Sequence, residues 1–463
     1  MRALSFGLLA TAVSLGNVLG SAINDCAQVA NSSIDLYTYT FPLVLMQATS
    51  NQTAQDGLSG VITQDPSNHL VVKINLDTSY VQGFFNLEKY SYTLTVPNHG
   101  SRYWIAQYLD AYSNTFADPG NRTLEDKPYT FGLIGPKGHR NFLPKNATVY
   151  ESPTDMAWIL GRVYQNGTTT DQEIVTDLIK QWVVTKYPLH SSKPISVTST
   201  PIANGTAPSG SVAPLAAVTS LTTQEFFDTA SQLMCDNQPA HADKKFLQKM
   251  SKDLGFKPCS KEAFKKPNFV YSCLLPNFTT TAVKTIAAEG VASAAAIMHD
   301  GWPVYTSGIG AYGTNFIFRA VVALVGLGAN LAEDAVYPSA TKTAAGVPLN
   351  TSQAYTLTFQ KGDFPPVDAF WSITYYNAQN YLQPNTANVY ALRSADPFTY
   401  NSNGSLTIFV QANAPSNSSF SKNWLPSQSN GTFTLTLRLY NPQQAILNGS
   451  WVPPPIIQSA QPI

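Results

Sequence analysis

The stretch TFTLTLRL at residues 432–439 alternates apolar and polar side chains with a period of two. Phe433, Leu435, Leu437 and Leu439 share one face, and threonine and arginine side chains share the other. This alternation is typical of an antiparallel strand with one face on a core and the other in solvent. The stretch therefore predicts a half-buried antiparallel strand near the C-terminus.

Further strands are expected on the N-terminal side of this stretch, in runs rich in Tyr, Thr, Val and Phe. They are 69–76, 90–96, 103–109, 130–134, 148–150, 355–359, 369–376 and 406–411. Helical periodicity predicts helices at 36–48, 171–182, 224–234, 243–254, 280–298 and 315–331. Thr223 and Asp243 are expected to cap two of them.

The order β, then α, then β predicts a mainly β protein of the α+β class with a helical middle region. We expect a β-rich domain at 21–190 and a Ser/Thr/Pro-rich linker at 191–222. A helical connecting region at 223–340 and a second β domain at 341–463 follow.

The N-terminus has the pattern of a secretory signal peptide, residues 1–20. Arg2 precedes an apolar stretch at 3–19, and the small residues Gly20, Ser21 and Ala22 follow. Polar residues interrupt the stretch, and it falls short of the ~20 residues that a membrane helix needs. We therefore expect a secreted protein with no membrane contact.

Glycosylation acceptors support this route. Asn-x-Ser/Thr occurs twelve times, and each acceptor in use must lie at the surface. The acceptors are Asn31, Asn51, Asn121, Asn146, Asn166, Asn204, Asn277, Asn350, Asn403, Asn417, Asn430 and Asn448.

The four cysteines, Cys26, Cys235, Cys259 and Cys273, suggest two disulfides in an oxidising compartment. Three pairings are open. We favour one bridge within 235–273 and one that ties Cys26 to that segment. Neither these cysteines nor the six histidines have the spacing of a metal site, so no metal is expected.

Composition excludes several functions. Apolar residues make up 44% of the chain, and charged residues only 12%, with 28 basic and 28 acidic side chains. No basic patch stands out, which argues against nucleic-acid partners and polybasic membrane contact. The oligomeric state stays open.

A glycine motif resembles a dinucleotide fingerprint. Gly308, Gly310 and Gly313 match G-x-G-x-x-G, and Glu333 lies about 20 residues further on. The buried strand that should precede this motif is missing. We therefore expect a loop before a helix, and no cofactor.

Polar and aromatic residues cluster at 75–80, 100–114, 152–162, 362–372 and 423–426. In so charge-poor a chain, their charged side chains are expected to have partners: Arg102, Asp110, Arg162, Arg319, Asp368 and Arg393. They form either structural ion pairs and caps, or an aromatic-lined pocket with a few polar groups that orient a small ligand.

These clusters resemble the two-part proteins that carry a DUF1254 region followed by a DUF1214 region. The first region is indicated by 41–46, 75–80, 102–116 and 152–162, and the second by 326–338, 362–376, 396–411, 423–426, 437–440 and 451–454. Phe318, Lys422 and Asn441 depart from the family pattern, and the segment 235–273 looks like an addition. The resemblance implies an N-terminal β-rich barrel or sandwich and a C-terminal jelly-roll-like antiparallel sandwich.

The resemblance extends to secreted fungal proteins that include hetero-Diels–Alder cyclases. It implies a cofactor-independent enzyme that joins a terpenoid alkene to a tropolone or quinone-methide partner. The physical needs are an apolar cavity that orients two hydrophobic substrates and a hydrogen-bond donor for a carbonyl oxygen. The candidates are Arg102, Tyr103 and Arg393 as catalytic residues, and Asp77, Tyr80, Asp110, Tyr112, Trp371 and Trp424 as substrate-binding residues.

Two other functions stay open from the sequence. A jelly-roll sandwich with exposed aromatic side chains could bind carbohydrate or another small ligand. A cofactor-free hydrolase could use a Ser–His–Asp triad assembled from distant positions, although no Gly-x-Ser-x-Gly motif occurs.

Overall fold

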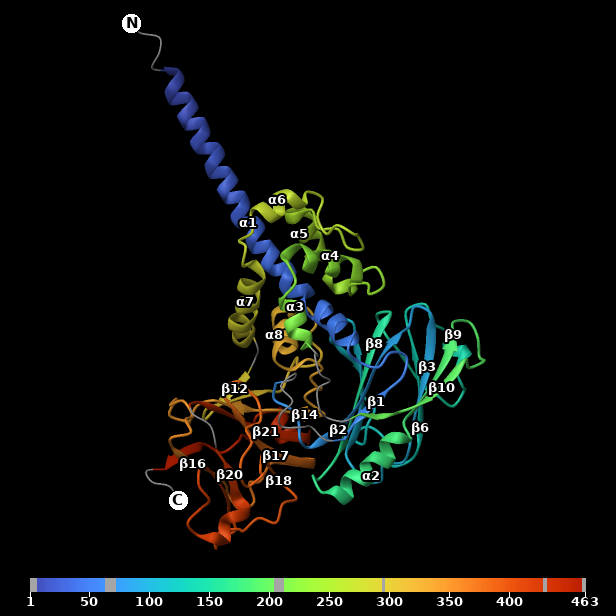
Figure 1. Cartoon of the computed structure of the whole chain (residues 1–463), viewed down its shortest axis with the longest axis vertical. Coiled ribbons are helices and arrows are strands. Elements are labelled where there is room, and N and C mark those ends of the chain that lie inside the picture. The colour runs from blue at the N-terminus through green and yellow to red at the C-terminus, as the bar shows by residue number, and fades with distance from the viewer. Residues whose placement is uncertain (1–5, 63–71, 204–211, 294–295, 428–430, 460–463) are drawn as a thin grey trace.

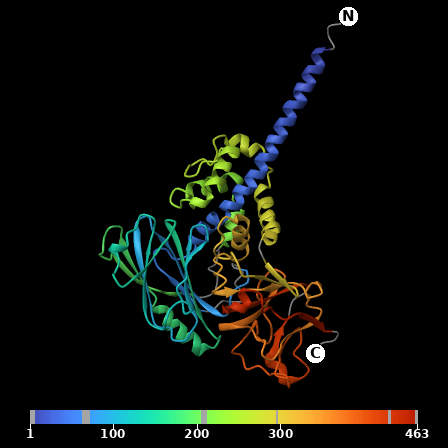
Figure 2. The ribbon, with the colours of Figure 1, turned by 180° about the vertical axis from the view of Figure 1, so that it is seen from behind.

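Two β domains and a helical bundle make up the structure, a computed structural model of the whole chain (Figure 1). It describes residues 6–62, 72–203, 212–293, 296–427 and 431–459, with side chains from residue 25 onward except those of Ala203 and Val291. The bundle sits above the two β domains, which lie side by side in both ribbon views (Figures 1 and 2). The mainly β, α+β fold class expected from the sequence is confirmed.

The N-terminal β domain is a sandwich of two sheets. Their strand orders are β11-β1-β2-β8-β4-β5 and β10-β9-β3-β6-β7. Trp104, Tyr108, Phe131 and Trp182 fill the core between them, and the described strands close no barrel. The elements are β1 Ser59–Val61, β2 Thr78–Asn86, β3 Tyr90–Val96, β4 Trp104–Asp110, β5 Thr115–Ala117, β6 Tyr129–Ile134, η1 Arg140–Phe142, β7 Thr148–Glu151, β8 Met156–Tyr164, α2 Thr169–Lys180, β9 Val183–Pro188, β10 Ser196–Ser199 and β11 Ile202–Ala203.

The helical bundle is built around the C-terminal half of α1. Tyr37 of α1 is fully buried and stacks on Phe226 of α4, with the ring centroids 4.0 Å apart. In the described part of the chain, no helix is both long and apolar enough to cross a membrane. The helices are α1 Phe6–Ser50, α3 Pro214–Thr219, α4 Thr223–Leu233, η2 His241–Asp243, α5 Lys244–Leu254, α6 Pro267–Ser272, α7 Phe278–Ser293 and α8 Phe316–Gly326.

The C-terminal β domain is also sandwich-like. One sheet has the order β14-β21-β17-β18, with β15 also paired to β21, and the other has the order β20-β19-β16-β22. Leu357, Ile373, Ile408 and Leu437 meet in the core between the two sheets. The elements are β12 Ala296–His299, β13 Trp302–Tyr305, β14 Ala335–Val336, β15 Ser339–Ala340, β16 Ala354–Phe359, β17 Val367–Asn377, β18 Ala391–Arg393, β19 Leu406–Gln411, η3 Ser418–Asn423, β20 Trp424–Pro426, β21 Phe433–Pro442, α9 Gln444–Leu447 and β22 Ile456–Ser459.

Strand β21 forms where the alternating stretch predicts it, but both of its faces are buried. Leu435, Leu437 and Leu439 face the sandwich core as expected. The opposite face, which carries Arg438 and Tyr440, is covered by the N-terminal domain. The prediction of a half-buried strand was therefore wrong, because alternation separates two faces without telling which medium covers each.

Three predicted elements differ from the structure. Of the strand expected at 69–76, residues 69–71 lie outside the described residues, and 72–76 form a turn and irregular chain. The helix expected at 280–298 ends at Ser293, and Ala296–His299 instead pairs with β13 as a hairpin. The helix expected at 315–331 ends at Gly326. The capping residue of α4 is Thr222 rather than Thr223, with a reciprocal bond to Glu225.

Two domain boundaries shift. The segment predicted as a linker, 191–222, contains β10, β11 and α3, and its strands extend the two sheets of the N-terminal domain. Residues 25–50, assigned to the β-rich domain, belong to the bundle because α1 packs against α4, α5, α7 and α8. The glycine motif at 308–313 is a loop before α8, as expected, with positive φ at Gly308, Gly310 and Gly313.

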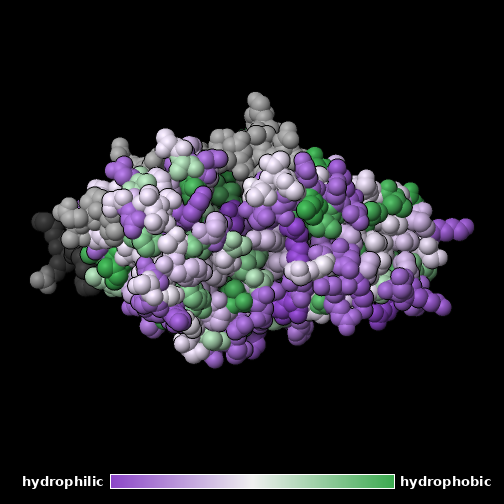
Figure 3. Space-filling view, turned by 90° about the horizontal axis from the view of Figure 1, so that it is seen from below, coloured by the Kyte–Doolittle hydropathy of each residue, from purple (hydrophilic) through white to green (hydrophobic). Residues whose placement is uncertain are grey.

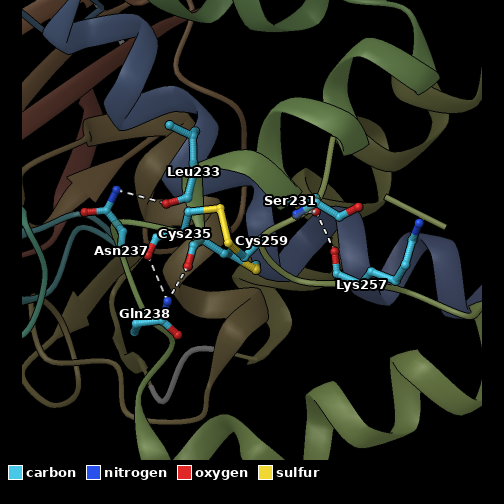
Figure 4. Close-up of a disulfide and its surroundings, with 9 residues drawn as sticks. Ser231, Leu233, Cys235, Asn237, Gln238, Lys257 and Cys259 are labelled. Carbon is cyan, nitrogen blue, oxygen red and sulfur yellow. Dashed lines mark hydrogen bonds between the residues drawn. A yellow bond between two sulfur atoms is a disulfide. The ribbon is translucent and has the colours of Figure 1, made fainter. Parts of the chain in front are cut away.

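Two disulfides join the cysteines in the pairing favoured from the sequence. Cys26 bonds to Cys273 and thereby ties α1 to the end of α6. Cys235 bonds to Cys259 just beyond the end of α4, and Ser231 in the last turn of α4 donates to the carbonyl oxygen of Lys257 (Figure 4). Oδ1 of Asn237, which lies between the two bridged cysteines, accepts a hydrogen bond from the backbone N–H of Met156 in β8. The segment closed by this disulfide therefore also contacts the N-terminal β domain.

The described acceptor asparagines all reach the surface. Eight of the ten are exposed, and Asn121 and Asn350 are half-buried. Asn204 and Asn430 lie outside the described residues. Seen from below, the surface of the molecule is mostly hydrophilic, with small, separate apolar groups (Figure 3).

Candidate functional site

Polar side chains from the two β domains meet in a buried layer between β17, β18 and β21 of one domain and β2, β4 and β8 of the other. The two domains lie side by side in the ribbon views (Figures 1 and 2). Residues 72–77, which we name the strap, run along this layer before β2 begins. We name the group of side chains the interdomain cluster. It consists of Asp77, Tyr80, Tyr103, Arg162, Tyr337, Ser372, Tyr376, Arg393, Arg438 and Tyr440.

Asp77 is the centre of one half of the cluster. Its carboxylate is fully buried, and Nε of Arg393 donates to Oδ1 at 3.1 Å. The hydroxyl of Ser372 donates to Oδ2 at 2.5 Å. Ser372 and Arg393 are register partners on β17 and β18, so their side chains project from the same face of the sheet toward the strap.

Arg438 binds the strap from the middle of β21. It donates to the carbonyl oxygen of Lys73 at 3.1 Å, to the hydroxyl of Tyr376 at 2.6 Å and to Thr374 at 2.8 Å. Tyr376 in turn donates to the carbonyl oxygen of Ile74 at 2.6 Å. These bonds explain why the strap forms no strand: its carbonyl groups are occupied by side chains of the other domain.

Arg162 lies on the N-terminal side of the cluster, in the middle of β8, and is 5% exposed. It donates to the amide oxygen of Gln107 at 2.7 Å and to the carbonyl oxygen of Gly328 at 2.9 Å. Gly328 has a φ of 81°, and an added Cβ would lie 2.9 Å from Trp158, so the carbonyl reaches Arg162 only with glycine there. Among the described residues, Nε of Arg162 has no hydrogen-bond partner, and none of its hydrogen bonds goes to a carboxylate.

Aromatic rings fill the space between these arginines. Tyr103 packs edge-on against Tyr440 and Phe370, with centroid distances of 5.2 Å and 5.7 Å. Phe370 stacks on Tyr440 at 4.1 Å. Asn75 of the strap donates to the Tyr440 hydroxyl at 2.8 Å, whereas the buried Tyr103 hydroxyl has no partner among the residues described.

The cluster favours neutral tyrosines beside charged arginines. Burial raises the pKa of Tyr103 and Tyr440 well above the ordinary value, and it raises the pKa of Tyr337 to about 12. Burial opposes the charge of Arg162, yet the hydroxyls of Tyr80 and Tyr337 hold its pKa above the ordinary value. At neutral pH the tyrosine hydroxyls and the guanidinium groups are therefore all hydrogen-bond donors.

Arg102 lies at the rim of this layer. It forms a bidentate pair with Asp171 of α2, with distances of 2.6 Å and 3.1 Å, and donates to the carbonyl oxygen of Tyr164 at 2.8 Å. The ring of Tyr164 lies 4.3 Å from that of Phe370, which stacks on Tyr440 of the cluster. The side chains of Arg102 and Arg393 are 17% and 14% exposed, so both arginines reach solvent at the rim.

Four candidate residues lie away from the cluster. Asp110 bonds to Asn114 in its own turn, and Tyr112 packs toward the bundle, where its hydroxyl donates to Asn237 and its ring lies 5.4 Å from Arg319. Trp371 faces the sandwich core, because it alternates with Ser372 along β17. Trp424 donates to Gln411 at the edge of the other sheet. The structure therefore unites Asp77, Tyr80, Tyr103 and Arg393, and brings Arg102 to their rim.

The charged residues noted in the sequence all have partners. Arg319 donates to the carbonyl oxygen of Tyr39, and Asp368 accepts from Gln443.

The members of the cluster that the sequence did not single out include Arg438 and Tyr440. The feature of the sequence that could have pointed to them is a charged residue, Arg438, in the middle of an apolar strand with the sequence TLTLRLY. Among the described residues, no group of three or more His, Cys, Asp and Glu could hold a metal ion.

Two known families match the chain. Residues 61–186 match the DUF1254 family and residues 334–444 match the DUF1214 family, each described as a protein of unknown function. The chain belongs to the family that combines these two regions. The interdomain cluster takes Asp77, Tyr80, Tyr103 and Arg162 from the DUF1254 region, and its other members from the DUF1214 region.

Two solved structures resemble the chain over most of its length. The VPA0106 protein from Vibrio parahaemolyticus is 19% identical, with a TM-score of 0.65, and the match covers 93% of this chain and all of that chain. An uncharacterised protein from Burkholderia cenocepacia is 13% identical, with a TM-score of 0.45, over 97% of this chain and 98% of that one. The first match shows that the two chains share a fold. None of the curated proteins compared with the chain matches it.

Proposed function

We propose that the protein is a secreted, cofactor-independent enzyme of small-molecule biosynthesis that uses the interdomain cluster for a hetero-Diels–Alder cycloaddition. The substrates would be a terpenoid alkene and a tropolone or quinone-methide partner. The reaction closes one C–C and one C–O bond, with no leaving group and no change in the number of electrons. The protein needs only to orient the two partners and to stabilise charge on a carbonyl oxygen.

The observation that supports this role is the state of Arg162 and Tyr103. Both lie in a buried, ring-lined layer, and Nε of Arg162 and the Tyr103 hydroxyl have no partner among the described residues. A buried donor without a partner costs about 1–3 kcal/mol, so a fold retains one more readily where a ligand uses it. A carbonyl oxygen that gains negative charge in the transition state would accept from these donors.

Access requires the two β domains to separate along the rim near Arg102 and Arg393. The rim is held by the pairs Arg102–Asp171 and Arg393–Asp77 and by Tyr164 packed on Phe370. Arginine side chains here keep part of their surface in water, which lowers the cost of rearranging them. The oligomeric state does not enter the proposal.

The test is incubation of the purified protein with a quinone-methide precursor and a humulene-type alkene, followed by chiral analysis of the adduct. Wild-type protein should give one enantiomer in excess, faster than buffer, and Arg162→Lys should lose most of this acceleration. Trp424→Phe, remote from the cluster, is the matched control and should behave as wild type. A racemic adduct formed at the buffer rate would refute the proposal.

Carbohydrate binding and hydrolysis remain the two alternatives. Retention of the protein on a glycan array without any product would favour binding. Labelling by a fluorophosphonate probe would favour a hydrolase. In the described part of the chain, no hydrogen bond joins a histidine to a serine hydroxyl, and His99 instead accepts from the indole of Trp182 at 3.1 Å.

A further inference from the structure

A surface hollow of about 410 Å³ lies on the N-terminal β domain, and none of its lining residues belongs to the interdomain cluster. Its walls come from three neighbouring strands, β3, β6 and β7, and from the loops that precede β6 and β7. The residues relevant to its chemistry are Thr95, Lys127, Tyr129, Thr130, Asn146 and Thr148. Its size is at the lower end of the ~300–1,000 Å³ that small-ligand pockets occupy.

The hollow contains a glycosylation acceptor in its own wall. Asn146, Ala147 and Thr148 form an Asn-x-Thr site, and the Asn146 side chain is exposed. Thr148 begins the edge strand β7, which pairs with β6 in parallel, so the acceptor lies on an open edge that an oligosaccharide transferase can reach. A glycan on Asn146 would start inside the hollow.

The wall around Tyr129 has the composition of a sugar-binding surface. The ring of Tyr129 stacks on Phe131 of the core, 5.7 Å away and nearly parallel, so the core holds its orientation. The ammonium of Lys127 lies 5.5 Å from the Tyr129 centroid. Thr95 and Thr130, whose hydroxyls lie 3.3 Å apart, project from the other face of the sheet, because side chains alternate along β6. An aromatic ring beside one ammonium group offers a stacking surface for sugar C–H groups and a donor for sugar hydroxyls.

We propose that the N-glycan of Asn146 folds back into this hollow, with its first N-acetylglucosamine units packed on Tyr129. The proposal rests on passage through the secretory pathway, which is part of the proposed function, but not on the cycloaddition. The glycan would shield the edge of β7 and become part of the domain surface. An edge strand left open can pair with other chains, so this cover would oppose aggregation.

The experiment uses the full chain secreted from a eukaryotic host. Peptide mass spectrometry measures the occupancy of each acceptor, and the native protein is then treated with a peptide N-glycosidase. The glycan on Asn146 should be released at least about threefold more slowly than that on Asn403, an exposed acceptor in a turn. Tyr129→Ser should bring the two rates together and leave the occupancy of Asn403 unchanged.

Three outcomes would overturn the proposal. They are an unmodified Asn146, equal release rates in the wild type, or slow release that persists in Tyr129→Ser. Binding of free chitooligosaccharide to Asn146→Gln protein, with an unmodified wild-type Asn146, would instead make the hollow a binding site for soluble sugar. Each of these results leaves the cycloaddition test untouched, because that test can be run on unglycosylated protein.

Discussion

Arg393 and Asp77 are 316 positions apart in the chain, and Nε of the arginine donates to Oδ1 of the aspartate at 3.1 Å. Arg393 also donates to the carbonyl oxygen of Leu76 at 3.0 Å. These bonds clamp the strap onto the C-terminal domain. From Lys73 to Asp77, every residue of the strap takes part in a hydrogen bond with that domain.

Asp77→Asn should weaken the contact between the two β domains. Loss of one partner of a buried ion pair costs ~3–5 kcal/mol, and we expect about 2–3 kcal/mol here because Arg393 keeps some contact with water. Urea-induced unfolding measures the change. Asp177→Asn, which removes a carboxylate of an exposed pair with Lys180, is the control and should leave the midpoint unchanged. Equal midpoints for the two variants would contradict a structural role for Asp77.

Tyr103→Phe should change stability and activity in opposite directions. The substitution removes a buried hydroxyl that has no partner in the described structure, so the free energy of unfolding should rise by about 1 kcal/mol. If the hydroxyl donates to the reacting carbonyl, the rate of cycloaddition should fall by about tenfold or more. Thermal unfolding and single-turnover kinetics measure the two effects. A variant that is stabilised and fully active would remove Tyr103 from the mechanism.

Asp334 should make stability decrease as the pH rises. Burial and the neighbouring Asp118 carboxylate raise its pKa to about 8, despite a 2.7 Å bond from Arg122. An unfolded aspartate has a pKa of ~3.9, so between these values the folded chain holds a proton that the unfolded chain has released. The free energy of unfolding therefore falls across that window.

Asp334→Asn cannot titrate, so the difference in melting temperature between wild type and variant isolates this group. The wild type should lose several degrees relative to the variant between about pH 5 and pH 8. Parallel curves for the two proteins over this range would show that Asp334 titrates normally.

His99 should make stability increase as the pH rises, in a lower pH range than Asp334. It is stacked on Trp104 and accepts from Trp182, and burial lowers its pKa to about 4. As the pH falls, His99 binds a proton at pH ~6.5 in the unfolded chain but only at about pH 4 in the folded chain. Stability is therefore complete above pH ~6.5 and falls as the pH drops, by up to about 3 kcal/mol. His99→Gln, compared with the wild type by urea unfolding at pH ~7 and pH ~4.5, should lose this slope.

The positions of strands could be predicted from the sequence better than what covers each face of those strands. Leu435, Leu437 and Leu439 mark a strand because side chains alternate across any sheet. The same alternation could not show that Arg438 and Tyr440 face another protein domain, since a polar face suits water and a polar interface equally well. The strap was mistaken for a strand because its residues resemble one locally, while its hydrogen-bond partners come from β17, β18 and β21.

The candidate site was predicted in part for the same reason. Charged residues in a charge-poor chain need partners, which pointed to Arg393. The family resemblance made Asp77 a substrate-binding candidate, but neither argument predicted the contact between the two residues. Trp371 was expected to line the site, and its neighbour Ser372 does so instead. Neighbouring residues of a strand point to opposite faces of the sheet, so a shift of one residue moves a side chain from one face to the other. Apolar residues precede and follow Ser372 in β17, so the sequence did not show which face the core covers.

The position of α1 at the centre of the bundle has a consequence for biosynthesis. Arg319, which bonds to Tyr39, is synthesised 280 residues after it, and translation of that length takes roughly 15–60 s at ~5–20 residues per second. Within that interval Tyr37 lacks its ring partner Phe226 until α4 emerges, and the bundle is complete only when α8 follows. Chaperones would have to shelter the nascent helix until α8 emerges, so the yield of the protein should depend on the folding capacity of its host.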